Sequence, residues 1–371
     1  MNGIQKALTV LCAQLLPIMH AAAQSQVAIN DGPYLFYETG KPILKTIRDN
    51  QVVTFANPDN VEITFKDHPD WNFVVAIKGQ LDIEPSEWKK PDDKLLVISD
   101  IEGEFEVFRA LLLANKVVDS QYNWIYGKGQ LVIDGDLFDR GSHVTEYLWL
   151  LYKLEQDATS KGGYVHTILG NHDIMNLSGD LRYVLPKYKE SAQLMGVDYM
   201  RLYDENTELG RWLRTKNVME RIGDQLFMHA GLSPEILKLH LSVPEINEKC
   251  RPFLATPKKS LPDTMKVFFG KDSPFWYRGY FMAPRATLTD VDLSLNYYQC
   301  KRIIVGHTIL DRNIALYYRG KVLGIDVDAH SGKCSGALFK HNRWYIINDK
   351  GIEKKLRYKK GNDIIKDSDV L

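Results

Sequence analysis

Hydrophobic and polar positions follow two different rhythms along the chain. Before residue 94, short apolar runs are separated by Gly, Pro, Asn and Asp, and they predict strands at 34–37, 52–55, 61–65 and 73–77. We expect this segment to form a small antiparallel β extension. It carries no obvious chemistry of its own.

From residue 94 onward, continuous apolar runs alternate with runs of helical periodicity. The apolar runs are at 95–98, 131–133, 166–169, 225–228 and 302–305, and helical spacing follows the first two at 105–113 and 147–154. Such runs are typical of strands buried on both faces of a sheet. Four more short strands, at 314–317, 322–325, 336–339 and 344–347, are expected to complete a second sheet. The pattern therefore predicts an α/β domain with two sheets.

The remaining segments complete a predicted division of the chain. Residues 1–23 are predicted to be a signal peptide, 24–93 the β extension, 94–349 the catalytic domain with a charged helical insertion at 177–221, and 350–371 a C-terminal tail. Lys6, the apolar stretch 7–19 and the small residues Ala21 and Ala23 favour export to the periplasm or secretion over an ordinary N-terminal helix. No later stretch reaches the ~20 apolar residues that a membrane span needs.

Composition excludes some partners and leaves others open. The 371 residues carry 47 Lys and Arg against 47 Asp and Glu, so no global field favours nucleic acid, and attraction for an anionic substrate must be local. Cleavage of the signal peptide would leave Cys250, Cys300 and Cys334. These could form one disulfide in an oxidising compartment, or could all be buried thiols.

The polar residues of greatest interest stand where the predicted strands end. They are Asp100, Glu102, Asp136, Asn171, His172, His229 and His307, at five strand ends. Ligands of open α/β sheets bind beyond the carboxyl ends of the strands, so we expect these side chains to share one edge. Mixed oxygen and imidazole donors without Cys favour Mn, Fe, Zn or Mg. Two such ions bridged by one carboxylate can activate water and neutralise a phosphate, so the pattern predicts phosphate ester hydrolysis.

The turn after residue 133 combines both requirements of such a site. It holds Asp136, Asp139 and Arg140 within five residues. Two carboxylates beside a guanidinium are costly to bury without a cation for the carboxylates and an anion for the arginine. This turn therefore predicts a metal site that handles phosphate.

The ordered motifs resemble those of calcineurin-like metallophosphoesterases, over about residues 94–338. They are Asp-x-x-Gly from Asp100, Gly-Asp-x-x-Asp-Arg-Gly at 135–141, Gly-Asn-His-Asp at 170–173, His-Ala-Gly at 229–231 and Gly-His at 306–307. The Asp-Arg-Gly ending and the run His-Ala-Gly-Leu-Ser-Pro are most similar to the phosphoprotein phosphatase branch, in particular to Shewanella-like phosphatases. The resemblance implies two sheets packed face to face, with helices on the outer faces.

The resemblance also implies a role for each residue. Two divalent metal ions, with manganese preferred, are expected: Asp100 and Glu102 would hold the first, Asn171, His229 and His307 the second, and Asp136 would bridge them. A metal-bound hydroxide would attack a phosphate monoester. His172 would protonate the leaving alkoxide, Asp139 would orient His172, and Arg140 would grip the phosphate together with Arg278, whose match is weaker.

The resemblance leaves the substrate open. The expected substrates are phosphorylated protein side chains, with serine and threonine favoured by the branch. The alternatives are dinucleoside polyphosphates and other small phosphoesters.

Two positions depart from the family pattern. Glu102 stands where the family has histidine, and Asp173 where the phosphatase branch usually has glutamate. Glu102 could ligate and shift the first site toward Mg or Mn, or could leave that site weak, in which case the protein would be a metal-binding sensor. Asp326, Asp328 and His330 are expected to form a polar strand end at the rim of the site.

Overall fold

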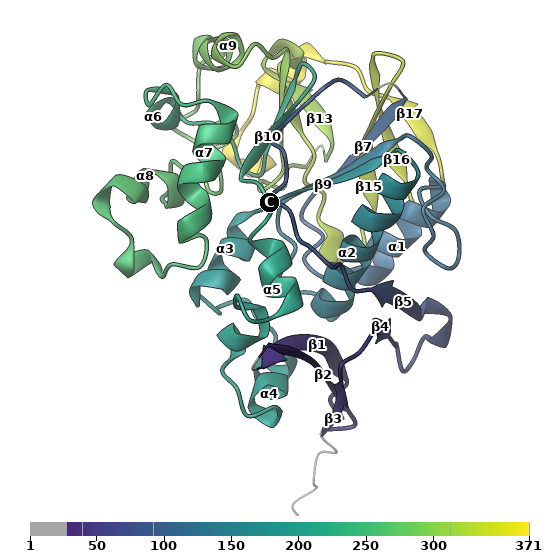
Figure 1. Ribbon diagram of the computed structural model, residues 1–371. Helices are drawn as coiled ribbons and strands as arrows, with labels where there is room; N and C mark the ends of the chain where they lie inside the picture. Colours follow the sequence, from purple (N-terminus) through teal and green to yellow (C-terminus); the bar gives the residue numbers. More distant parts are fainter. Residues whose placement is uncertain (1–27, 39, 92, 312, 371) are drawn as a thin grey trace, which may run out of the picture.

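Two six-stranded sheets packed face to face form the centre of the computed structural model, which describes residues 28–38, 40–91, 93–311 and 313–370 (Figure 1). The predicted signal peptide lies outside the described residues. Helices cover the outer faces, as predicted from the family resemblance.

The first sheet has the order β17-β16-β15-β7-β8-β9. Its parallel strands are β7 (Lys94–Ile98), β8 (Gln130–Asp134) and β9 (Tyr164–Ile168), and its antiparallel strands are β15 (Ser335–Lys340), β16 (Arg343–Asn348) and β17 (Glu353–Lys355). Alternate side chains of β7 enter different cores. Leu96 belongs to the core that includes helices α1 (Phe105–Ala114) and α2 (Val144–Ser160), whereas Val97 belongs to the core between the two sheets. Burial on both faces explains the continuous apolar runs.

The second sheet has the order β13-β14-β12-β11-β10-β6. Its strands are β6 (Glu87–Trp88), β10 (Met219–Ile222), β11 (Gln225–Met228), β12 (Arg302–Val305), β13 (Ala315–Tyr317) and β14 (Val322–Gly324). The expectation that all four late strands complete the second sheet was wrong. β13 and β14 join it, but β15 and β16 extend the first sheet because the chain crosses from one sheet to the other after Gly324.

The N-terminal extension packs against the main domain. It contains the antiparallel sheet of β1 (Asp31–Glu38), β2 (Lys41–Arg48) and β3 (Gln51–Ala56) and the hairpin of β4 (Asn60–Ile63) and β5 (Phe73–Ala76). The sequence pattern missed β2, since Pro42 and the polar residues Lys45, Thr46 and Arg48 interrupt its apolar run. β1 contacts α2 and α5 (Glu208–Leu213) and buries Phe36.

The other helices connect the strands and surround the site edge. They are α3 (Asn171–Ser178), α4 (Pro186–Leu194), α5 (Glu208–Leu213), α6 (Pro234–Leu237), α7 (Val243–Cys250), α8 (Lys266–Phe269) and α9 (Leu288–Tyr297). Within the segment predicted as a helical insertion, α4 and α5 are followed by the start of β10. Among the described residues, no helix has the length and apolar character of a membrane span. Cys250, Cys300 and Cys334 are all free thiols.

Candidate metal centre

The turns that follow the strands place many of the predicted site residues in an unusual backbone conformation. The following have positive φ angles: Asp100 (54°), Glu102 (45°), Asp136 (54°), Asp139 (79°), Arg140 (52°) and His307 (64°). The left-handed region is unfavourable for residues with a Cβ, and such strain is often found at functional sites. Backbone hydrogen bonds connect these turns. Glu102 N donates to Asp136 O at 3.0 Å, and Gly306 N donates to His229 O at 2.8 Å.

Glycines allow these turns to approach closely. A Cβ added at Gly306 would lie 2.3 Å from Oδ2 of Asp100, and one added at Gly170 would lie 2.2 Å from Oδ1 of Asp136. Such distances are far shorter than any real carbon contact. Both positions therefore need glycine to let carboxylates of one turn reach the backbone of another.

Three predicted metal ligands converge on Asp136, itself a predicted ligand. Nδ1 of His229 donates to the backbone oxygen of Asp134 at 2.9 Å, and its Nε2 lies 3.0 Å from Asn171 Oδ1 and 3.1 Å from Asp136 Oδ2. His307 is 6% exposed, and its Nε2 has no hydrogen-bond partner. Ligand atoms of Asp136, His229 and His307 lie within 4.8 Å of one another. This set of lone pairs, with an unpaired buried nitrogen, fits a divalent cation.

A second group of side chains surrounds Glu102. Its carboxylate is 2% exposed and contacts Nη1 of Arg140 on one oxygen and Nε2 of His330 on the other. Asp100 accepts hydrogen bonds from His307 N at 3.1 and 3.2 Å. Glu102, Asp136 and His172 form another set of ligand atoms within 4.8 Å, so Asp136 belongs to both sets.

His172 is held by a chain of hydrogen bonds. Its Nδ1 lies 2.6 Å from Oδ2 of Asp139, and Oδ1 of Asp139 accepts a bond from Asn176 Nδ2 at 2.8 Å. Tyr199 in turn donates to Asn176 Oδ1 at 2.6 Å. The other ring nitrogen of His172 faces the site, 3.5 Å from Glu102 Oε1. The imidazole thus has one nitrogen fixed by a buried carboxylate and the other directed at the metal-binding groups.

Asp173 connects two of the turns. Its carboxylate accepts bonds from the backbone N–H groups of Leu137 at 2.8 Å, Phe138 at 3.2 Å and Gly170 at 2.6 Å. The shorter acidic side chain at this position therefore acts on backbone geometry. It holds the turn after β8 against the start of α3.

Two arginines flank the cluster. Arg278 donates to His307 O at 3.0 Å and to Thr308 Oγ1 at 3.3 Å. The side chain of Arg140 is 41% exposed, and its guanidinium lies 5.0 Å from the ring centre of Tyr183. Tyr183 is itself 43% exposed, and its ring centre lies 5.1 Å from that of His172, so an exposed aromatic ring lies beside the site.

Burial and charge shift the pKa values in opposite directions. Burial raises the pKa of Asp100 to about 6, and burial followed by the charge of Asp100 raises the pKa of Asp326. Burial alone would also raise the pKa of Asp136, but the neighbouring His229 and His172 lower it. Burial lowers the pKa of His330, but hydrogen bonds to Glu102 and Glu104 raise it to about 9. A cluster of buried carboxylates of this kind is a frequent feature of functional sites.

All the predicted site residues lie in this one cluster, and several residues join it that the sequence did not assign. Asn176 follows His172 by one helical turn, a spacing that could have revealed it.

The segment 325–328 is not a strand. Asp326 is buried with an unpaired Oδ1, Asp328 binds Ser331, and His330 reaches Glu102.

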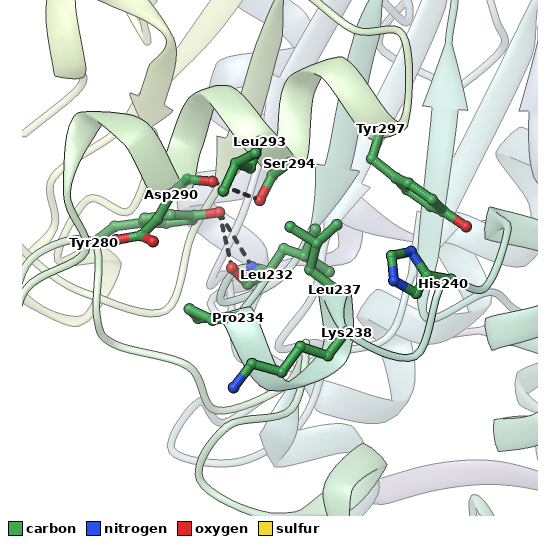
Figure 2. Close-up of a pocket in the computed structure, with 10 residues that line it drawn as sticks. All are labelled: Leu232, Pro234, Leu237, Lys238, His240, Tyr280, Asp290, Leu293, Ser294 and Tyr297. Atoms are coloured by element: carbon green, nitrogen blue, oxygen red, sulfur yellow. Dashed lines mark hydrogen bonds between the residues drawn. The ribbon is translucent and has the colours of Figure 1, made fainter.

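The described structure also contains a pocket away from this cluster. It has a cavity volume of about 360 Å³ and lies between α6 and α9, where it is lined mainly by apolar atoms (Figure 2). None of its lining residues is a predicted site residue. Its polar groups, such as Lys238 and Asp290, do not converge as the groups around Asp136 do. We therefore place the chemistry at the strand ends.

The chain is similar to known proteins over much of its length. The model of the calcineurin-like phosphoesterase family matches residues 93–310. Shewanella-like protein phosphatase 2 of Arabidopsis thaliana is 28% identical over 70% of this chain and 76% of its own length. An uncharacterised protein of Schizosaccharomyces pombe is 31% identical over 64% of this chain and 72% of its own length. The structure of a cold-active protein-tyrosine phosphatase from a psychrophilic Shewanella species is 33% identical, with a TM-score of 0.82, and covers 88% of this chain and 99% of its own.

Proposed function

The chain belongs to the calcineurin-like phosphoesterase family, and on that premise we propose that it hydrolyses phosphate monoesters on protein side chains with two divalent metal ions. The convergence of Asp136, His229 and His307, with an unpaired buried nitrogen on His307, is the observation that carries the proposal.

We assign the metal-binding groups as the sequence predicted them. Asp100 and Glu102 would hold one ion and Asn171, His229 and His307 the other, with Asp136 shared. When bound, two such ions supply positive charge for the phosphate oxygens and lower the pKa of water. The mixture of carboxylate, amide and imidazole donors suits manganese, with Fe, Zn and Mg as alternatives.

His172 is the proposed general acid. Asp139 accepts a hydrogen bond from Nδ1–H, so the proton available for transfer is the one on Nε2, which faces the site. Burial lowers the pKa of His172, but Asp136 and Asp139 raise it above the ordinary value, which favours the protonated ring that an acid needs. Protonation of a leaving alkoxide by a positioned acid contributes roughly 10²–10⁴-fold to the rate.

Arg140 and Arg278 are the proposed phosphate-binding groups. Arg278 keeps its position through bonds to the backbone oxygen of His307 and to Thr308. Arg140 is paired with Glu102, so it would exchange this carboxylate for a phosphate oxygen when substrate binds. Guanidinium groups suit this exchange because they bind carboxylates and phosphates with the same geometry.

Protein substrates are supported by the relatives. The Arabidopsis relative is named a protein phosphatase, and the Shewanella structure is described as a protein-tyrosine phosphatase. Tyr183 adds a structural reason to include phosphotyrosine, since an exposed aromatic ring beside His172 can pack against an aryl leaving group. The serine and threonine preference expected from sequence stays a prediction.

Phosphate release from a panel of substrates tests the proposal. Metal-free protein would be reconstituted with Mn²⁺ and given phosphotyrosine, phosphoserine and phosphothreonine peptides, a dinucleoside tetraphosphate and an aryl phosphate. Metal-dependent hydrolysis with phosphopeptides preferred supports the proposal. Preference for the dinucleotide would redirect it to small substrates. Absence of hydrolysis of every compound, with at most one metal per chain, would identify a sensor instead.

Export is a separate part of the proposal. It rests on Lys6, the apolar stretch 7–19 and the small residues Ala21 and Ala23. N-terminal sequencing of the protein purified from a periplasmic or culture fraction should show that the first 23 residues are missing. An intact N-terminus in the cytoplasmic fraction would contradict export.

A further inference from the structure

The carboxylate of Glu102 meets a histidine from a distant part of the chain. Nε2 of His330 contacts Oε2 of Glu102, although 228 residues separate them in sequence. His330 lies in the short helical turn Ala329–Ser331, where the chain crosses between the two sheets. Oε1 of Glu102 contacts Arg140, so the histidine contacts the oxygen that Arg140 leaves free. The fold thus brings an imidazole to Glu102, one of the carboxylates proposed to hold the first ion.

Glu104 fixes the orientation of this imidazole. Nδ1 of His330 lies 2.9 Å from Oε1 of Glu104. Carboxylates contact both ring nitrogens, so both can donate in the metal-free protein. Glu104 holds the proton on Nδ1, and Nε2, the atom that faces Glu102, would present a lone pair once a cation displaces its proton. Histidines that bind metals usually have this arrangement, in which one ring nitrogen is held by a carboxylate and the other is free to ligate. The side chain is 28% exposed, so the ring can adjust its position.

We propose that His330 is the nitrogen ligand of the metal site that contains Asp100, Glu102 and Asp136, and that Glu104 is its positioning residue. This inference rests on the proposed two-metal function. The first strand-end turn provides Glu102 where the resembled family has histidine, and His330 returns an imidazole to the same carboxylate from another loop.

The ligand atoms of the first metal site also affect which ion it binds. Without His330, the first site would consist of carboxylate oxygens only, a set that suits Mg²⁺ and Ca²⁺. One imidazole shifts the preference toward Mn²⁺, Fe²⁺ and Zn²⁺. His330 therefore determines which ion the first site selects as well as how tightly it binds.

Titration of the metal-free full chain with Mn²⁺, followed by the EPR signal of free Mn²⁺, tests the inference. The variants are His330→Gln, His330→Ala and Glu104→Ala. His341→Ala, which removes an exposed histidine, is the matched control. Gln at position 330 keeps a polar group beside Glu102 but removes the imidazole, so it separates a ligand from a residue that only holds Glu102 in place. Circular dichroism establishes that each variant is folded.

We expect wild type and the His341→Ala control to bind two Mn²⁺ per chain. His330→Gln and His330→Ala should weaken one site by about tenfold or more and leave the other unchanged, with a smaller loss in Glu104→Ala. Glu102→His in the His330→Ala background should restore the lost affinity, because it returns an imidazole to the first site. Mg²⁺ should compete with Mn²⁺ more effectively in His330→Gln than in wild type.

The outcomes separate this inference from the proposed function. If His330→Gln binds two Mn²⁺ with wild-type affinities, His330 is not a ligand and the inference is overturned, while the two-metal function stands. If wild type itself binds no Mn²⁺, the proposed two-metal function is wrong, and the inference that rests on it is overturned with it. If His330→Ala is unfolded, the His330→Gln titration by itself decides whether His330 is a ligand.

Discussion

Oδ2 of Asp139 lies 2.6 Å from Nδ1 of His172, and this contact joins the turn after β8 to the start of α3, 33 residues along the chain. The carboxylate is 2% exposed and receives a second bond from Asn176. A buried carboxylate with two donors has little freedom to move. It therefore fixes the ring of His172 with the opposite nitrogen directed at the site.

Replacement of Asp139 by Asn should slow catalysis without loss of metal. The amide cannot stabilise the protonated imidazole, so kcat should fall about 10²-fold. The loss should be larger for a phosphoserine peptide than for p-nitrophenyl phosphate, since p-nitrophenolate leaves without a proton. Steady-state kinetics of the Mn²⁺-loaded variant measures this. Asp263→Asn, at a carboxylate that is 93% exposed, is the control, and equal losses for both substrates would contradict the acid role.

Replacement of Arg140 by Ala should weaken phosphate binding. A charge-assisted bond contributes about 1.5–3 kcal/mol, so the inhibition constant of inorganic phosphate should rise roughly 10–100-fold. Arg182→Ala provides a matched control because its guanidinium also lies over Tyr183, at 5.6 Å, but pairs with Asp180 outside the cluster. Similar phosphate inhibition in both variants would exclude Arg140 as a phosphate-binding group.

Gly306→Ala should disrupt the metal centre. The new methyl group would lie 2.3 Å from Oδ2 of Asp100, so the carboxylate or the turn must move. We expect a loss of about 1–3 kcal/mol in the free energy of unfolding and weaker Mn²⁺ binding. Gly79→Ala adds the same group where no atom lies within 4 Å and should change neither quantity. Wild-type Mn²⁺ affinity in Gly306→Ala would show that the close approach is not required.

Glu146 should make stability depend on pH. Burial raises its pKa from 4.5 to about 7, and its Oε2 has no hydrogen-bond partner. The folded protein therefore holds this proton more tightly than the unfolded chain, and its stability should fall as pH rises through this interval. Glu146→Gln cannot titrate. Its stability relative to wild type should increase by at most about 1.4 kcal/mol per pH unit between pH 5 and 7, measured by urea unfolding. Parallel stability curves for the two proteins would show that Glu146 ionises freely.

The sequence predicted the elements whose signals are local. β7, β8 and β11 are continuous apolar runs, so their positions and the polar turns after them followed from periodicity. β2 was missed because its pairing with β1 and β3 compensates for its polar residues. The late strands were assigned to one sheet because periodicity does not show which neighbour a strand pairs with.

The same distinction applies to the site. Strand-end residues could be collected from the sequence since parallel strands bring their ends together. The contacts of Glu102 with Arg140 and His330 depend on how three separate loops meet, which spacing along the chain does not encode. The sequence predicts a polar segment that includes His330, but its contact with Glu102 arises only in the folded chain.

The number of metal ions bound by wild type and by Asp136→Asn tests the central claim most directly. Asp136 belongs to both sets of converging ligand atoms, so its carboxylate should be required for both ions. Elemental analysis of Mn²⁺-loaded protein, with Asp263→Asn as the folded control, should find two ions per chain in wild type and none in Asp136→Asn, which should also lack hydrolysis. Two ions and full activity in Asp136→Asn would contradict the account.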